Sequence, residues 1–272
     1  MIAVVGQSVI DRVRLPDGSE VERLGGSPVF AAAALQFAGR SGVILTKGAT
    51  TELRAPLAAF GLPVAIGEAT ASFVSELEIF GDGDRRHEIA AFGEPFRPDE
   101  VTGWMAPHLE AVGAVVCGAQ WRDDFPAATL RALAARDRTV LLDAQGPSRP
   151  PRLGAVIDEG PLDPAWVDGV TVLKCSEIEA AALFGDDDPG RSGVPVVVVT
   201  HGLHGAIVHL PDGAHEVLGV PVRGLADAIG AGDTFMTLMA VALVDGADPV
   251  AAATAAAHGT SALLRRRLEQ SS

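Results

Sequence analysis

Residues 226–235, with the sequence ADAIGAGDTF, place glycines and an aspartate at the start of a long apolar run. The first amides of a helix are unpaired and carry partial positive charge, and glycine lets an anion approach the backbone closely. Gly230, Ala231 and Gly232 would therefore surround negative charge on a transferring phosphoryl group. Asp233 could take the proton of an attacking hydroxyl. The alternative is an ordinary helix start in which Asp233 only complements the helix dipole.

Other stretches place glycines, hydroxyls or acids where a predicted strand meets a helix or a loop. They are Thr200, Gly202 and Gly205; Ser176 and Glu179; Gly25 and Gly26; and Asp11. Two common phosphate-binding patterns are missing. No GxxxxGK[ST] occurs, and GQSVID rather than GxGxxG follows the first strand, which argues against a P-loop and a Rossmann dinucleotide site.

The elements that must position these residues alternate along the chain. Short apolar runs of the kind buried in a parallel sheet occur at 2–6, 42–46, 114–119, 139–144, 171–176 and 194–200. Segments with helical periodicity occur at 27–39, 51–61, 99–113, 125–137, 177–185, 230–246 and 248–267. This alternation predicts a three-layer α/β/α fold with a mostly parallel central sheet and helices on both faces. Residues 205–220 add antiparallel strands at one edge.

Two segments interrupt the alternation and read as hairpins. Residues 9–26 turn at Pro16-Asp17-Gly18, and residues 73–94 turn at 81–84. We expect a single domain over 1–272, in which segments of about 11–24 and 73–94 form a small β lid over a cleft. Two surface hairpins without a function are the alternative. The lid would leave the chain a monomer or pair two chains in a homodimer.

Composition excludes several classes of protein. The net charge of −14 argues against a nucleic-acid or anionic-membrane surface. No signal sequence or membrane helix is expected, so we interpret the chain as cytoplasmic. Cys117 and Cys175 are expected to be free buried thiols. The basic cluster at 265–267 is expected to complement the dipole of the last helix.

Taken together, the motifs resemble the ribokinase-like (PfkB-type) carbohydrate kinase family. Asp227-x-x-Gly230-Ala231-Gly232-Asp233 matches its C-terminal signature, and the Gly25-Gly26 helix start matches its weaker N-terminal signature. The resemblance extends from Val4 to the last helix.

The resemblance implies a role for each matched position. Asp233 would be the catalytic base, with Gly230, Ala231 and Gly232 as the anion hole. The ATP site would comprise Thr200, Gly202, Gly205 and Ser176. Apart from the resemblance, His258 on the last helix would flank adenine, with an ordinary helix surface or core position as the alternative. Glu179 would hold Mg²⁺ through water. Asp11, Gly25 and Gly26 would contact the acceptor.

The chain departs from the family pattern at several positions. Ser176 stands where the family has the Asn of Asn-x-x-Glu. Ala228 and Ile229 replace two Thr of the signature, which leaves a requirement for a monovalent cation open. The stretch LLDAQGPSR at 141–149 resembles a branch that includes inositol kinases, in which Arg149 would reach a phosphate. A solvated loop arginine is the alternative for Arg149.

These observations predict an ATP-dependent kinase that phosphorylates a hydroxyl of a sugar or of a cyclitol such as inositol. A nucleoside kinase on the same fold is the alternative enzyme, although the chain has no Tyr and only 5% aromatic residues. A ligand-binding protein without catalytic activity is the alternative from another class.

Overall fold

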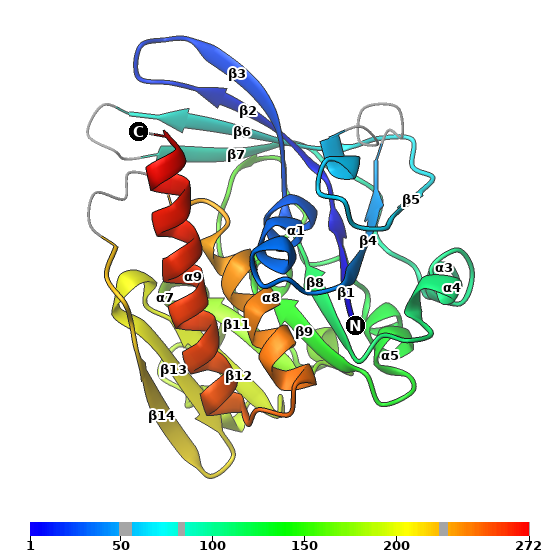
Figure 1. The fold of residues 1–272 in the computed structure, drawn as a ribbon, viewed down its shortest axis with the longest axis vertical. Helices are drawn as coiled ribbons and strands as arrows, with labels where there is room; N and C mark the ends of the chain where they lie inside the picture. Colours follow the sequence, from blue (N-terminus) through cyan, green and yellow to red (C-terminus); the bar gives the residue numbers. More distant parts are fainter. Residues whose placement is uncertain (49–55, 81–84, 223–227, 272) are drawn as a thin grey trace.

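The computed structural model describes residues 1–48, 56–80, 85–222 and 228–271. Its central sheet has nine strands (Figure 1). They are β1 (Ile2–Gln7), β4 (Gly42–Lys47), β5 (Val64–Gly67), β8 (Ala114–Gly118), β9 (Thr139–Asp143), β11 (Val172–Ser176), β12 (Val196–Thr200), β13 (Gly205–Leu210) and β14 (Gly213–Leu218). The spatial order is β14-β13-β12-β11-β9-β8-β1-β4-β5.

The sheet is parallel except at one edge. Every pair from β12 to β5 is parallel, whereas β12–β13 and β13–β14 are antiparallel. All residues of β1 and β4 are buried, as expected for strands covered on both faces. The predicted fold class is therefore confirmed, and β5 is an additional edge strand that the sequence analysis did not identify.

Helices form a layer on each face of this sheet. One layer contains α1 (Ser27–Phe37), α8 (Ala231–Val244) and α9 (Pro249–Ser271), which lie side by side in Figure 1. The other contains α5 (Ala127–Ala134) and α7 (Glu177–Phe184). Consecutive residues of β1 face opposite layers: Val4 packs in the core with α1 and α8, and Val5 packs in the core with α5 and α7.

Two local expectations were wrong. The segment 99–113 was predicted as one helix but forms α3 (Pro98–Thr102) and α4 (Ala106–Leu109), because Gly103 ends the first with φ −93° and ψ −113°. Residues 145–148 were expected in a loop but form the short helix α6 (Gln145–Ser148). The beginning of the helix expected at 51–61 lies outside the described residues.

The two predicted hairpins join in a second sheet of five strands. Its members are β2 (Val9–Arg14), β3 (Glu20–Gly25), β6 (Phe73–Ile79), β7 (Arg85–Ala91) and β10 (Gly154–Ala155), in the order β10-β7-β6-β2-β3. In β2 the residues Val9, Asp11 and Val13 are buried while Arg12 and Arg14 are exposed. The sheet thus has one covered and one wet face. The turn expected at 81–84 lies outside the described residues.

Two further observations concern the whole described chain. Cys117 and Cys175 are buried and free, as expected. Among the helices of the described ranges, none has the length and apolar character needed to cross a bilayer.

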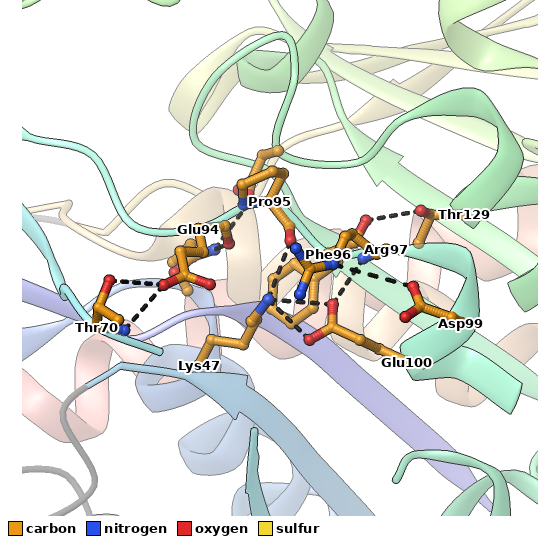
Figure 2. A network of polar contacts seen from close by, with 11 residues as sticks. Lys47, Thr70, Glu94, Pro95, Phe96, Arg97, Asp99, Glu100 and Thr129 are labelled. Atoms are coloured by element: carbon orange, nitrogen blue, oxygen red, sulfur yellow. Dashed lines mark hydrogen bonds and ion pairs between the residues drawn. The ribbon is translucent and has the colours of Figure 1, made fainter. Parts of the chain in front are cut away.

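A buried ion pair fastens the chain where it returns from β7 to the core (Figure 2). Lys47, at the end of β4, is fully buried, and its Nζ lies 2.8 Å from Glu100 Oε1. The same ammonium donates to the carbonyl of Pro95 at 3.0 Å. Pro95 and Glu100 are thereby fixed to the carboxyl end of β4.

The neighbouring residue extends this network to β1. The carboxylate of Glu94 accepts hydrogen bonds from the backbone and hydroxyl of Thr70. Its carbonyl accepts from Gln7 Nε2 at 2.7 Å, and that amide also donates to Asp124 Oδ1 at 3.0 Å. The segment that leaves the second sheet after β7 is thus held by contacts with β1, β4 and Asp124.

Removing the ammonium of Lys47 tests this anchor. We expect Lys47→Met to lower the free energy of unfolding by about 3 kcal/mol, because Glu100 keeps a buried charge without its cation. Urea denaturation measures the change. Arg131→Met is the matched control, since Arg131 and Asp168 form an exposed pair whose loss changes stability by less than about 1 kcal/mol. Equal effects of the two substitutions would contradict the anchoring role.

Candidate active site

One cavity of about 580 Å³ is lined by residues of both sheets and of helices α8 and α9. The second sheet contributes Asp11, Ser75 and His87 among others, and the central sheet contributes side chains from the carboxyl ends of its strands. Ligands of open α/β sheets commonly bind beyond these ends. This cavity brings together the start of α8 and the acids that the sequence analysis selected.

The floor of the cavity is the first turn of α8. Gly230 precedes the helix in the left-handed region, with φ +75°, and a side chain there would collide with the ring of Phe30. Ala231, Gly232 and Asp233 follow and line the cavity. Glycine is therefore required at position 230 for both conformation and space. The amide of Ala231 donates to the carbonyl of Ala228 at 3.0 Å, so Gly232 and Asp233 supply the amides that are expected to face an anion.

Lys174 lies directly beneath this turn. A Cβ atom at Gly232 would be 2.8 Å from its Nζ, and the same Nζ is 2.9 Å from Asp143 Oδ2. Burial alone would lower the pKa of Lys174, but the carboxylates of Asp143, Glu179 and Asp233 raise it above its ordinary value. Lys174 is therefore a permanent cation at the base of the anion site.

The carboxyl group of Asp233 is tuned by the same surroundings. Burial raises its pKa to about 6, and the negative charge of Asp143 adds to this shift. A hydrogen bond from Ser27 and the charge of Lys174 act in the opposite direction. A carboxylate with a pKa close to neutrality suits proton transfer better than an ordinary aspartate does.

Glu179 and Ser176 begin helix α7 as a capping box. The backbone of Ser176 donates to Glu179 Oε2 at 2.7 Å, and the backbone of Glu179 donates to Ser176 Oγ at 3.3 Å. The pattern Ser-x-x-Glu predicts this arrangement by itself. Both residues also line the cavity, and burial raises the pKa of Glu179.

The donor set around Glu179 is compatible with Mg²⁺ held partly by a ligand. No three His, Cys, Asp or Glu residues of the described chain form a cluster that could hold a metal alone. Mg²⁺ usually keeps several waters and binds one or two carboxylates together with substrate phosphates. Glu179, with one oxygen committed to the helix cap, fits such a site through water.

One end of the cavity is largely apolar. Leu203, Val220, Ala257 and Leu264 line it. Thr200, Gly202 and Gly205 lie at the same end, and Thr200 Oγ1 donates to the carbonyl of Cys175 at 3.0 Å. We call this part the donor end, because the resemblance predicts the ATP site at Thr200, Gly202 and Gly205.

The opposite part of the cavity is polar, and we call it the acceptor end. Asp11 is 6% exposed, and burial raises its pKa although Arg23 and a hydrogen bond with Ser75 oppose the shift. Ser75 Oγ lies 2.8 Å from His87 Nε2. Three neighbouring strands thus direct a connected row of polar groups into the cavity.

Arg149 also lines the cavity, and its positive charge acts to lower the pKa of Glu179. Its side chain is 12% exposed, and its Nε lies 3.6 Å from Asp158 Oδ1. The alternative of a solvated loop arginine is therefore wrong: Arg149 follows α6 and is buried with an acidic partner.

The cavity collects most of the site residues predicted from the sequence. Those that line it are Asp11, Gly26, Arg149, Ser176, Glu179, Thr200, Gly202, Gly205, Gly230, Ala231, Gly232 and Asp233. Gly25 lies behind Asp11, where a side chain would collide with the carboxylate. His258 is exposed on α9 and is not among the lining residues.

Lys174, Ser75 and His87 are among the lining residues that were missed. Lys174 had a visible signal, because it is the one charge within the apolar run at 171–176. Ser75 and His87 lie in an alternating hairpin, where polar residues are ordinary, so no local pattern distinguishes them.

The comparisons agree with this geometry. Residues 152–271 match the family model described as pfkB family carbohydrate kinase. None of the curated proteins compared with the chain matches it.

Solved structures match over nearly the whole chain. A pyrophosphate-dependent kinase of the ribokinase family, complexed with a pyrophosphate analog and myo-inositol, has a TM-score of 0.81 at 21% identity, covering 99% of each chain. A nucleoside kinase of Burkholderia thailandensis in complex with inosine has a TM-score of 0.74 at 15% identity, covering 100% of this chain and 98% of that one. The ribokinase of Arabidopsis thaliana complexed with ribose and ATP has a TM-score of 0.69 at 18% identity, covering 97% and 98%.

The family match includes the whole turn at the start of α8, and the solved structures extend the fold to the second sheet. The resemblance predicted from the motifs is thus confirmed: residues 152–271 match the pfkB carbohydrate kinase family, and the whole chain has the fold of solved ribokinase-family kinases.

Proposed function

We propose that the protein transfers the terminal phosphoryl group of ATP to a hydroxyl of a small polyhydroxylated acceptor, a sugar or a cyclitol. The observation that carries this proposal is the position of Asp233. It lies in the same helix turn as the anion site, and that turn lines the cavity shared by the donor and acceptor ends. Phosphoryl transfer needs an oriented hydroxyl and compensated charge more than covalent chemistry from the protein.

In the proposed reaction the carboxylate of Asp233 accepts the proton of the acceptor hydroxyl. The acceptor oxygen forms a bond to the terminal phosphorus, and the bond from that phosphorus to the bridging oxygen breaks, releasing ADP. The amides of the first turn of α8 and the ammonium of Lys174 stabilise the negative charge on the phosphoryl oxygens. Mg²⁺, when bound with the nucleotide, would neutralise further phosphate charge, and Glu179 would hold it through water.

The acceptor class follows from the polar character of the acceptor end. Asp11, Ser75, His87 and Arg149 offer charged and uncharged groups that suit several hydroxyls on one small ring. Structures of this fold have been solved with myo-inositol, ribose and inosine. A nucleoside kinase therefore stays the alternative enzyme.

The apolar donor end supports a nucleotide as donor, because a purine ring would cover Leu203, Val220 and Leu264. Pyrophosphate is the second candidate, favoured by Lys174 beneath the anion site and by the use of pyrophosphate in one solved relative. Turnover assays with each donor, over a panel of cyclitols, sugars and nucleosides, test the proposal. Saturable ligand binding with no turnover would favour the non-catalytic alternative.

Substitution of the proposed base is the most direct test. We expect Asp233→Asn to reduce kcat about 10²- to 10⁴-fold, because the amide cannot accept the hydroxyl proton. Binding of the donor, measured by calorimetry, should change little. Near-complete turnover in the variant would rule out Asp233 as the base.

The raised pKa of Asp233 predicts the acid side of the pH profile. A base with a pKa of about 6 is protonated below that pH, so kcat/KM should fall roughly tenfold per pH unit below about 6. Lys174→Met should move this limb to higher pH, since Lys174 lowers the pKa of Asp233. Thermal denaturation over the same pH range separates loss of turnover from unfolding. A limb near pH 4, where an ordinary aspartate titrates, would contradict the assignment.

The acceptor end is tested through Ser75. We expect Ser75→Ala to raise the acceptor KM about tenfold, because one hydrogen bond to the acceptor is lost and the contact that orients His87 from Ser75 is removed. The donor KM should stay unchanged. Arg86→Gln is the matched control, since Arg86 lies next to His87 on β7 and is 63% exposed. If both variants behave alike toward the acceptor, Ser75 does not contact it.

A further inference from the structure

The three arginines near the end of α9 differ in their surroundings. Arg265 and Arg266 are exposed, whereas Arg267 is half-buried. Arg267 Nη1 donates to the carbonyl of Ile229 at 3.4 Å. If the arginines only complemented the dipole of α9, Arg266 and Arg267 would serve equally well. The hydrogen bond to Ile229 gives Arg267 a role that Arg266 does not have.

A second contact leads to the same turn. The guanidinium of Arg267 lies 5.6 Å from the centre of the Phe30 ring, within the range of a cation–π interaction. The ring of Phe30 in turn packs so closely on Gly230 that no side chain fits there. Arg267 therefore contacts the turn at Ile229 directly and supports it at Gly230 through Phe30.

Helix α9 also holds the chain that precedes this turn. Ser261 Oγ donates to the carbonyl of Val220 at 2.7 Å, and Arg265 Nη2 donates to the carbonyl of Pro221 at 3.2 Å. The contact of Arg267 with Ile229 is thus the last of several that fix backbone carbonyls to one face of α9.

The direction of the Ile229 carbonyl matters for the anion site. In a trans peptide the carbonyl of one residue and the amide of the next point in opposite directions. Because the Ile229 carbonyl points to Arg267, the Gly230 amide points away from the arginine. A hydrogen bond to this carbonyl therefore sets the orientation of the peptide plane from which the turn and helix α8 begin.

We propose that Arg267 is a positioning residue of the anion site: it holds the Ile229–Gly230 turn so that the amides at the start of α8 face the phosphoryl group. The role rests on the proposed function, since it concerns the same site. Arg267 does not line the cavity and is not assigned contact with the substrate. Its guanidinium is a permanent positive charge beside the turn. This is the loop in which Ala228 and Ile229 leave a requirement for a monovalent cation open.

The test compares Arg267→Met with Arg266→Met, its exposed neighbour on the same helix. We expect Arg267→Met to lower kcat about ten- to a hundredfold, because a misplaced anion site loses transition-state stabilisation, with little change in the acceptor KM. Arg266→Met should stay within about twofold of wild type. Arg267→Lys, which keeps the charge, and guanidinium ion added to Arg267→Met should each restore part of kcat, which a purely structural loss would not allow.

Binding of pyrophosphate, measured by calorimetry, gives a readout that does not depend on turnover. Arg267→Met should bind it several-fold more weakly than wild type and Arg266→Met. If wild type turns over and the two methionine variants match in kcat and in pyrophosphate binding, the inference fails while the proposed function stands. If wild type shows no turnover, the proposed function fails. In that case weaker pyrophosphate binding by Arg267→Met still supports the inference, and equal binding overturns it. Wild type that neither turns over nor binds pyrophosphate overturns both.

Discussion

A single buried ammonium surrounded by three carboxylates is the constraint on which the site depends. Lys174 pairs with Asp143 and feels the charges of Glu179 and Asp233. Each of these acids comes from a different element, so the cation ties β9, β11, α7 and α8 to one point. Removing it would leave several buried negative charges without compensation, which is strongly unfavourable. The placement of the anion site therefore follows from electrostatic balance as well as from the glycines.

The same balance brings the pKa of Asp233, the proposed base, close to neutral pH. Two of its neighbours are negative and one is positive, and burial disfavours the ionised form. Without Lys174 the proton would be held more tightly; without Asp143 it would be lost more readily. The pKa of about 6 is therefore a property of the group of four charges, and no residue of the GAGD motif determines it alone.

The sequence predicted the parts of the molecule that depend on local pattern. Apolar runs identified the buried strands, alternation identified the two hairpins, and the glycines at 230 and 232 identified the helix start that lines the cavity. What it did not predict depends on contacts between distant segments: the pairing of Ser75 with His87, the position of Lys174 under Gly232, and the contact of Arg267 with Ile229. The single helix expected at 99–113 was wrong, because the prediction relied on the helical periodicity of the segment and not on Gly103, which ends α3.

The residues proposed for phosphoryl transfer and those proposed for acceptor binding lie on different sheets. Lys174, Asp233 and Glu179 are fixed by the central sheet and its helices, where any shift disturbs several buried charges at once. Ser75 and His87 lie on the second sheet, whose opposite face is wet. The contacts of Lys47 (Figure 2) fix the point where that sheet rejoins the core, and Gln7 adds a hydrogen bond there. Ser75 and His87 could therefore change with little effect on the charges at the floor, which would let the proposed site accept different polyhydroxylated rings.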